Sequence, residues 1–304
     1  MTGTESDNKI AVAFLGLGAI GAPMARHLAE PPFELTVWNR TRKKAEAFAG
    51  QSGALVAASP ADAARGRDFV ITCLPTSRDV EALLEGSDGL LAGFSRGATL
   101  LDCTSGDPGV SRRIAGRLRE VGVEFIDAPV SGGVSGAERG VLTVMCGGDA
   151  DVFERARPVL ESFGKKIVHC GPVGAGHALK AVNNMLLAVN IWSAGEGLAA
   201  LARAGVDIGA ALGVINSSSG RSNATENLFT ERVVTRAFPR TFRLALLDKD
   251  VGIAAAVARE QNVPSPLIQL TSELYRLAHG ALGEEADHVE AVKLIEQWAG
   301  IEIS

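Results

Sequence analysis

The chain has 304 residues, a net charge of -5, and a composition that is 46% hydrophobic and 21% charged. This length exceeds that of one ordinary domain, so we expect two well-cored globular domains. The acidic balance argues against a nucleic-acid partner, and the lack of a long apolar run or a signal-peptide pattern predicts a cytoplasmic protein without membrane contact.

A strand and a glycine-rich turn come first in the chain. Lys9–Phe14 is a short apolar run of strand character, and Gly16, Gly18 and Gly21 follow it directly. Here G-x-G-x-x-G predicts a dinucleotide-binding turn: the first glycine permits the turn, the second lets backbone amides approach a pyrophosphate, and the third lets a helix pack on the strand. The predicted cofactor-binding residues of this turn are Gly16, Leu17, Gly18, Ala19, Ile20 and Gly21.

The second predicted strand, Glu34–Trp38, ends without an acidic residue. A carboxylate at this position would normally bind the adenosine ribose, but the sequence continues with Asn39, Arg40 and Thr41. A guanidinium here can pair with a 2′-phosphate and a hydroxyl can add a hydrogen bond, so these residues predict a site that prefers NADP and can accept NAD. A solvated basic start to the next helix would explain the lysines that follow, but it leaves the missing acid unexplained.

Strand and helix patterns alternate up to residue 170, which predicts a Rossmann-type, doubly wound α/β sheet over residues 8–170. The further strands are Asp68–Cys73, Thr99–Asp102, Val123–Asp127, Leu142–Cys146 and Lys166–Cys170. Residues 171–304 show only helical patterns, which predict an all-α domain for substrate binding and oligomer contact. These helices run to Ala204 and then over Ile208–Asn216, Leu246–Glu260, Leu267–His279 and Asp287–Gly300. The polar interruption Asn216–Asn227 is a candidate for substrate contacts.

The four cysteines lie near the ends of apolar strand patterns and show no C-x-x-C spacing. We therefore expect buried, reduced thiols rather than disulfides, and no metal site. These residues are Cys73, Cys103, Cys146 and Cys170.

A lysine and an asparagine are the strongest candidates for chemistry. Gly171–Gly176 is a glycine-rich stretch, and in the helix that it opens Lys180 and Asn184 are spaced i, i+4, on one helical face. The residues that follow are apolar, so we expect a buried helix, and burial lowers the pKa of a lysine toward the range useful for proton transfer. Alternatively, a lysine in a first helical turn can extend to water.

Three loops at predicted strand ends complete the candidate site. Ser131, Gly132 and Gly133 follow the strand that ends at Asp127, where a hydroxyl and free amides can hold a small carboxylate, although glycines there can also serve only the turns. The other two loops lie where an open α/β sheet binds ligands, although their residues can also cap helices. They contain the predicted cofactor-binding residues Leu74, Pro75, Thr104 and Ser105.

Taken together, these motifs resemble the β-hydroxyacid dehydrogenase family over nearly the whole chain. They are the glycine-rich turn with Pro23-Met24-Ala25, the Asp102-Cys-Thr-Ser segment, the Asp127-Ala-Pro-Val-Ser-Gly-Gly segment, the run from Gly171 to Asn184, and Lys249-Asp250.

The resemblance implies a role for each matched residue. Lys180 is the catalytic acid/base, and Asn184 acts beside it and binds substrate together with Ser131, Gly132 and Gly133. Phe242 and Lys249 approach the cofactor from the helical domain, and Thr104 and Ser105 lie by the nicotinamide ribose. Ile20 stands where many members have methionine, a conservative difference.

The resemblance also implies a reaction, and the apolar residues of the helical part imply a quaternary structure. Members interconvert small 3-hydroxy acids and their semialdehydes, as with 3-hydroxyisobutyrate. NADPH-dependent reduction of tartronate semialdehyde, succinic semialdehyde or glyoxylate is the alternative, and an inactive cofactor-binding interaction module is a remote one. We expect a homodimer or homotetramer, because the lysine helix carries more apolar residues than its own core needs. These residues are Leu186, Leu187, Val189, Ile191 and Trp192.

Overall fold

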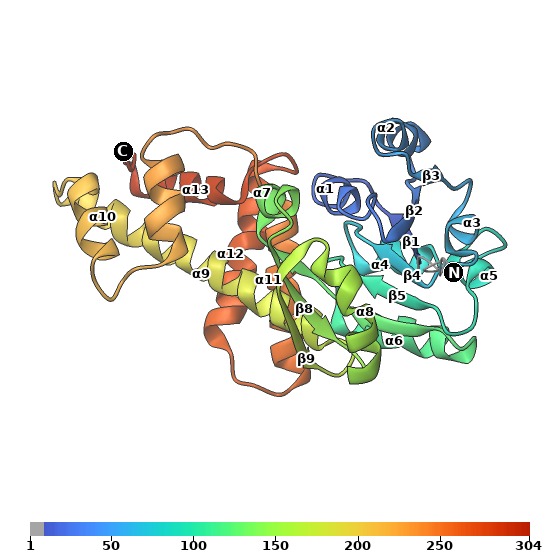
Figure 1. Cartoon of the computed structure of the whole chain (residues 1–304). Helices are drawn as coiled ribbons and strands as arrows, with labels where there is room; N and C mark the ends of the chain where they lie inside the picture. Colours follow the sequence, from blue (N-terminus) through green and yellow to red (C-terminus); the bar gives the residue numbers. More distant parts are fainter. Residues whose placement is uncertain (1–8) are drawn as a thin grey trace. The chain divides into compact units, whose positions relative to one another are not determined.

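The computed structural model describes residues 9–304, which divide into two compact units (Figure 1). The first unit ends at Lys180 and the second comprises Ala181–Ser304. Helix α9, Ala175–Arg203, begins in the first unit and continues into the second.

One sheet forms the centre of the first unit. Its strand order over the described residues is β3-β2-β1-β4-β5-β6-β8-β7, with β9 paired to β8. Neighbours from β3 to β6 are parallel, β8 is antiparallel to β6 and β7, and β9 is parallel to β8. The strands are β1 Ile10–Leu15, β2 Phe33–Trp38, β3 Leu55–Val56, β4 Phe69–Thr72, β5 Thr99–Asp102, β6 Glu124–Asp127, β7 Val130–Ser131, β8 Leu142–Gly147 and β9 Gly164–Gly171.

Helices cover both faces of this sheet, as a doubly wound fold requires. Successive residues of β1 alternate between two cores: Val12 and Phe14 pack with α1, α2, α7 and α8, whereas Ala13 and Leu15 pack with α3 to α6. The predicted α/β class is therefore confirmed. The helices are α1 Gly21–Arg26, α2 Arg42–Ser52, α3 Pro60–Ala64, α4 Ser77–Ala82, α5 Leu90–Gly93, α6 Pro108–Glu120, α7 Gly133–Glu138 and α8 Ala150–Glu161.

The second unit is helical around its own core, and the predicted all-α second part is confirmed. Tyr275 is a fully buried member of this core, and its hydroxyl donates to the Ala188 carbonyl at 3.1 Å. After α9 the elements are α10 Ile208–Asn216, the π-helix η1 Ala224–Val233, α11 Leu244–Glu260, α12 Pro266–Leu282, the 3-10 helix η2 His288–Ala291 and α13 Val292–Ala299.

The polar stretch Asn216–Asn227 is not irregular throughout, because η1 begins within it. The Thr225 hydroxyl accepts from the Ser222 amide at 2.9 Å, and the Ser222 hydroxyl accepts from the Thr225 amide at 3.2 Å. These reciprocal bonds hold the first turn of the helix. Apolar residues spaced by four or five positions then face the core, a period that suits a π-helix: Ala224, Leu228, Phe229 and Val233.

Helix α9 differs from expectation in two ways. Its 29 residues make it the one helix among residues 9–304 that is long and apolar enough to cross a membrane, so the prediction that no run has this length is wrong. The second difference lies in its apolar excess: Ile191 and Trp192 are buried and Leu187 and Val189 pack against the core, which leaves Leu186 exposed, at 53%. The apolar character of α9 thus mainly serves the core of the second unit.

The cysteines are unpaired, and two of them are less buried than expected. Cys103 and Cys146 are buried, while Cys73 and Cys170 are half-buried. Burial raises the pKa of the Cys73 and Cys146 thiols to about 12, which keeps both thiols protonated at neutral pH. Within residues 9–304 no three potential ligands of the His, Cys, Asp or Glu type come together as a metal site.

Candidate active site

The parallel strands of the first unit end in register at one edge of the sheet. Leu15 pairs with Trp38 and Thr72, Thr72 pairs with Asp102, and Asp102 pairs with Asp127. Because these are the last residues of their strands, the loops that follow leave the same edge. The structure thus brings the predicted cofactor-binding residues of the first unit to one place, and the order of β2, β1 and β4 makes this edge the topological switch point where open α/β sheets bind ligands.

The glycine-rich turn after β1 is held by close packing. Gly16 has φ +107°, and a Cβ there would overlap the carbonyl of Cys73, while a Cβ on Gly21 would overlap the carbonyl of Gly16. A Cβ on Gly18 would meet nothing within 4 Å. The outer glycines therefore shape the turn, and the backbone at the middle glycine is open to a phosphate group.

Asn39 supports this turn from the end of β2. Its side-chain oxygen accepts from the Leu17 amide at 3.0 Å, and its side-chain nitrogen donates to the Thr41 carbonyl at 3.1 Å. The Asn39 side chain is thus a brace between two loops, a role that the sequence alone did not indicate. Arg40 is exposed and, among the residues described, has no hydrogen-bond or ion-pair partner.

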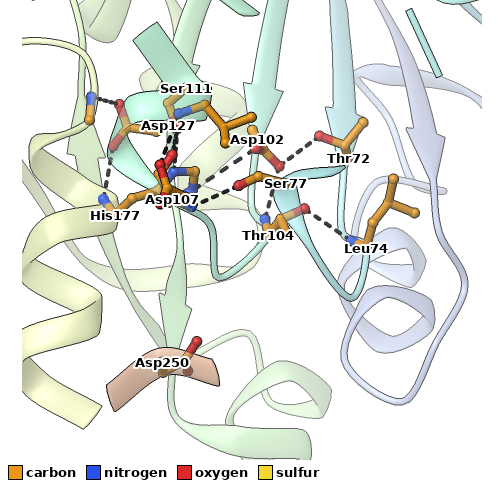
Figure 2. A network of polar contacts seen from close by, with 12 residues as sticks. Thr72, Leu74, Ser77, Asp102, Thr104, Asp107, Ser111, Asp127, His177 and Asp250 are labelled. Atoms are coloured by element: carbon orange, nitrogen blue, oxygen red, sulfur yellow. Dashed lines mark hydrogen bonds and ion pairs between the residues drawn. The ribbon is translucent and has the colours of Figure 1, made fainter. Parts of the chain in front are cut away.

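A line of buried hydrogen bonds connects the ends of β4 and β5 (Figure 2). Asp102 accepts from the Thr72 hydroxyl at 2.9 Å and from the Thr104 amide at 3.1 Å. The Thr104 hydroxyl in turn accepts from the Leu74 amide at 3.1 Å. Two of the predicted cofactor-binding positions, Leu74 and Thr104, are therefore fixed to each other, while Pro75 is exposed and Ser105 half-buried beside them.

The Asp127–Gly133 segment is more regular than the loop that we expected. Val130–Ser131 forms β7 and Gly133 begins α7, because β7 pairs with β8. Gly132 and Gly133 have φ of +136° and +65°, conformations that favour glycine. Ser131 is half-buried and both glycines are exposed, so this segment is accessible to a ligand.

Lys180 lies on α9 and is 9% exposed, so it does not extend into solvent as the alternative interpretation held. Asn184, 4% exposed, lies one turn later on the same helix. Its side-chain nitrogen donates to Asp250 Oδ2 at 2.6 Å, and the Asn183 side chain donates to its oxygen at 3.1 Å.

Asp250 is a functional candidate that the sequence reasoning left without a role. It is 2% exposed on α11, and its second oxygen lies 2.9 Å from Lys249 Nζ, so one buried carboxylate contacts two of the predicted site residues, Asn184 and Lys249. The signal was present in the sequence, because Leu247, Asp250 and Val251 follow helical spacing on the apolar face of α11. A charged residue at such a position needs a partner.

Phe242 is held by a second buried aspartate. Asp287 accepts from the Phe242 and Thr241 amides at 2.9 and 2.8 Å, and the Phe242 ring packs against His288 with 5.4 Å between centroids. Burial alone would raise the pKa of Asp287, but the His288 hydrogen bond and charge and the two amides hold it well below its ordinary value.

Family models of known proteins match both parts of the chain. A family model of the NAD-binding domain of 6-phosphogluconate dehydrogenase matches residues 11–171, and a model of the NAD-binding part of NADP-dependent 3-hydroxyisobutyrate dehydrogenase matches residues 174–295. The 2-(hydroxymethyl)glutarate dehydrogenase of Eubacterium barkeri is 34% identical over 98% of this chain and 99% of its own. The NAD-dependent L-serine dehydrogenase of Pseudomonas aeruginosa is 36% identical over 95% and 99%.

A solved structure shows the same likeness in three dimensions. The structure of a Mycobacterium tuberculosis 3-hydroxyisobutyrate dehydrogenase with L-serine superimposes with a TM-score of 0.87 at 30% identity, and covers 94% of this chain and 99% of its own. Fold, edge loops and relatives agree: the chain belongs to the β-hydroxyacid dehydrogenase family and is an NAD(P)-dependent hydroxyacid dehydrogenase.

Proposed function

We propose that the protein interconverts a small 3-hydroxy acid and its semialdehyde, with Lys180 as the acid/base. The observation that supports this proposal most strongly is that Lys180 is buried on a helix that starts beside the ligand-binding edge of the sheet. One turn further on, the side-chain amide of Asn184 is fixed by the buried carboxylate of Asp250. Buried amines in such sites are suited to proton transfer near neutral pH.

The names of the relatives define the substrate class more closely. 2-(Hydroxymethyl)glutarate, L-serine and 3-hydroxyisobutyrate all have a primary alcohol β to a carboxylate, and they differ only in the third group on the α-carbon. The substrate of this protein has the same HOCH2–CHR–COO⁻ skeleton. Ser131 and the amides of Gly132 and Gly133 bind its carboxylate, which fixes the distance between the carbinol and the lysine.

Each residue has one task in the reaction. A dinucleotide held by the loops at the edge of the sheet would supply the hydride chemistry, as acceptor in oxidation and donor in reduction. Lys180 takes the hydroxyl proton of the alcohol, or returns it to the aldehyde oxygen. Asn184 orients that oxygen through its amide, which Asp250 holds in one direction. The same carboxylate holds Lys249, and the resemblance to the family makes Lys249 and Phe242 the candidates for further cofactor contacts.

NADP is the preferred cofactor. The exposed Arg40 guanidinium stands beside the start of α2, whose first turn has no acidic residue and whose N-cap residue, Thr41, makes no side-chain cap in the described chain. A helix N-terminus with free amides and a nearby guanidinium favours a 2′-phosphate. This feature also favours, as a second candidate, NADPH-dependent reduction of tartronate or succinic semialdehyde or of glyoxylate.

The protein is a cytoplasmic homodimer or homotetramer that assembles through its helical part. Large apolar side chains remain exposed on α9, α10, α12 and α13, and water-exposed apolar surface of this kind is commonly covered by a second subunit. These residues are Leu186, Val214, Leu267, Leu270, Leu277 and Trp298. Light scattering at micromolar concentration tests this: two or four times 31.6 kDa is expected, and a persistent 31.6 kDa would contradict it.

The reaction is tested by a screen with both nicotinamide cofactors. The panel contains 3-hydroxyisobutyrate, L-serine, 2-(hydroxymethyl)glutarate and the semialdehydes, with the 2-hydroxy acids lactate and malate as controls. Turnover of at least one 3-hydroxy acid or semialdehyde, with NADP favoured and the controls inert, is expected. Turnover of only the 2-hydroxy acids would contradict the proposal, and cofactor binding without any turnover would point to the inactive interaction module.

A further inference from the structure

The first turn of α9 is held to the sheet by the side chain of a buried aspartate. Asp127, the last residue of β6, is fully buried, and its two oxygens accept from the Gly174 amide at 2.6 Å and the His177 amide at 2.9 Å. The first amides of a helix have no partner within it, so this carboxylate caps α9 from 47 and 50 residues away in the chain. Lys180 lies less than one turn beyond His177.

Two glycines leave room for this contact. A Cβ on Gly147, at the end of β8, would lie 2.6 and 2.8 Å from the two Asp127 oxygens. A Cβ on Gly176 would lie 2.9 Å from Asp127 Oδ2 and would overlap the Met145 carbonyl. The elements β6, β8 and α9 thus pack closely around one carboxylate. This close packing fixes the position of the start of α9 on the sheet.

The same turn is joined to the edge that holds the cofactor residues (Figure 2). The His177 ring is fully buried, with Nδ1 2.7 Å from the Ser111 hydroxyl and Nε2 4.0 Å from Asp102 Oδ2. Among the described residues these last two atoms have no hydrogen-bond partner. Asp102 is the residue that holds the Thr104 amide. A serine, a histidine and an aspartate in line suggest a hydrolase, but all three are fully buried, so no substrate reaches them.

We propose that Asp127 is a positioning residue for the reaction: its carboxylate fixes the start of α9 and thereby sets the place of Lys180 relative to the cofactor-binding edge of the first unit. This inference rests on the proposed function, since it concerns the lysine that transfers the proton. Burial, opposed by His177 and the two amides, raises the pKa of Asp127, so the protein keeps an electrostatically unfavourable group at this point.

The test is a double-mutant cycle between Asp127→Asn and Lys180→Ala. Asparagine keeps the shape but directs a donor at one of the two amides, which shifts the helix start. Displacements of about 1 Å near reacting groups lower rates by up to ~100-fold. In the parent background we expect Asp127→Asn to lower kcat per bound cofactor roughly 10- to 100-fold, with little change in cofactor Kd. In the Lys180→Ala background we expect Asp127→Asn to lower kcat by no more than about a further twofold. The second effect is small because Asp127 acts through the lysine.

Asp149→Asn is the matched control. Asp149 caps α8 in the same unit by accepting from the Asp151 and Val152 amides at 2.9 and 3.3 Å, and we give it no part in the reaction. Its kcat is expected to match the parent. If Asp127→Asn does not fold, Asp127→Ser, which keeps a smaller acceptor, enters the same cycle.

The outcomes separate this inference from the function on which it rests. Two outcomes would overturn the positioning role alone in a protein that turns over its substrate. In the first, kcat of Asp127→Asn equals that of the parent. In the second, Asp127→Asn lowers kcat by the same factor in the parent and in the Lys180→Ala background. An active Lys180→Ala variant, or a parent inactive on every 3-hydroxy acid and semialdehyde, would overturn the proposed function and this inference with it.

Discussion

Each compact unit contains a buried aspartate that holds backbone amides of a distant segment, and the two differ in the sign of their pKa shift. Asp127 accepts two amides at the start of α9, and its pKa is raised because burial outweighs them and His177. Asp287 accepts three amides and lies 3.0 Å from His288, and its pKa is lowered because these contacts outweigh burial.

The difference shows what each carboxylate contributes. A lowered pKa means that the charged form favours folding, so Asp287 stabilises the helical unit at neutral pH. A raised pKa means that the charged form of Asp127 opposes folding, so its ionisation does not stabilise the first unit; what this side chain provides is the two hydrogen bonds to the start of α9. The segment that carries Lys180 is thus organised for position, and the segment that carries Phe242 for stability.

The largest expected effect is the loss of catalysis when Lys180 of α9 is replaced. Lys180→Ala should lower kcat by ~100- to 10,000-fold, the usual loss when a general acid/base is removed, while the cofactor Kd changes little. Steady-state kinetics and a cofactor titration measure both quantities. Lys166→Ala, an exposed lysine on β9, is the control, and activity of Lys180→Ala within a few-fold of the parent would remove the lysine from the mechanism.

A smaller effect is expected at Arg40, an exposed residue of the same unit that we propose contacts the cofactor. Arg40→Asp should weaken NADPH binding roughly 10- to 100-fold and NADH binding much less, because it removes a phosphate partner and adds a like charge. Fluorescence titration with both cofactors checks this. Arg119→Asp, at the exposed end of α6, controls for the net charge, and a parent that prefers NADH would contradict our interpretation of Arg40.

At Asp287, in the segment that carries Phe242, we expect a change in stability. Asp287→Asn should lower the free energy of unfolding by about 1–3 kcal/mol at neutral pH, because buried amides lose a charged acceptor. Since the folded pKa lies below the unfolded one, this contribution is present above pH 3.8 and is lost as the pH falls further. Urea unfolding of Asp287→Asn at pH 7 and near pH 3 should therefore show a cost that shrinks in acid. Asp207→Asn, an exposed cap of α10, should cost less at pH 7, and a pH-independent cost at Asp287 would contradict the assignment.

The smallest effect has the opposite pH dependence. The folded pKa of Asp127 lies above the unfolded value, so its contribution to stability is present below pH 3.8 and is lost as the pH rises through the folded pKa. Asp127→Asn should therefore cost more stability in acid than at neutral pH. The same urea unfolding series at pH 7 and near pH 3 measures this loss of stability. If the free energy lost in Asp127→Asn grew with pH, as at Asp287, the proposed difference between the two aspartates would be wrong.

Local patterns carried most of the fold prediction. Gly16, Gly18 and Gly21 are read from spacing alone, and all seven predicted strands lie within a few residues of observed ones, because short apolar runs between turn residues define them. The strands β3 and β7 were missed because two residues show no periodicity. The helical spacing of Lys180 and Asn184 was likewise local and required no tertiary information.

Contacts between distant segments could not be predicted in this way. Nothing in the sequence joins Asp127 to Gly174, because the bond depends on the pairing of β6, β8 and the start of α9. The brace from Asn39 to Leu17 needs the register of β1 and β2. Asp250 was predictable in part. The helical spacing of α11 indicates that it is buried, but nothing in the sequence indicates that Asn184 is its partner.

Chemical rescue of Lys180→Ala tests the central claim most directly. Replacing the lysine by alanine leaves space for a small amine, so methylamine and ethylamine should restore 3-hydroxy acid oxidation in proportion to their concentration, because they can accept the proton in its place. Tetramethylammonium, which has the charge but no exchangeable proton, should restore nothing. Equal rescue by tetramethylammonium, or none by either amine, would contradict proton transfer at this position.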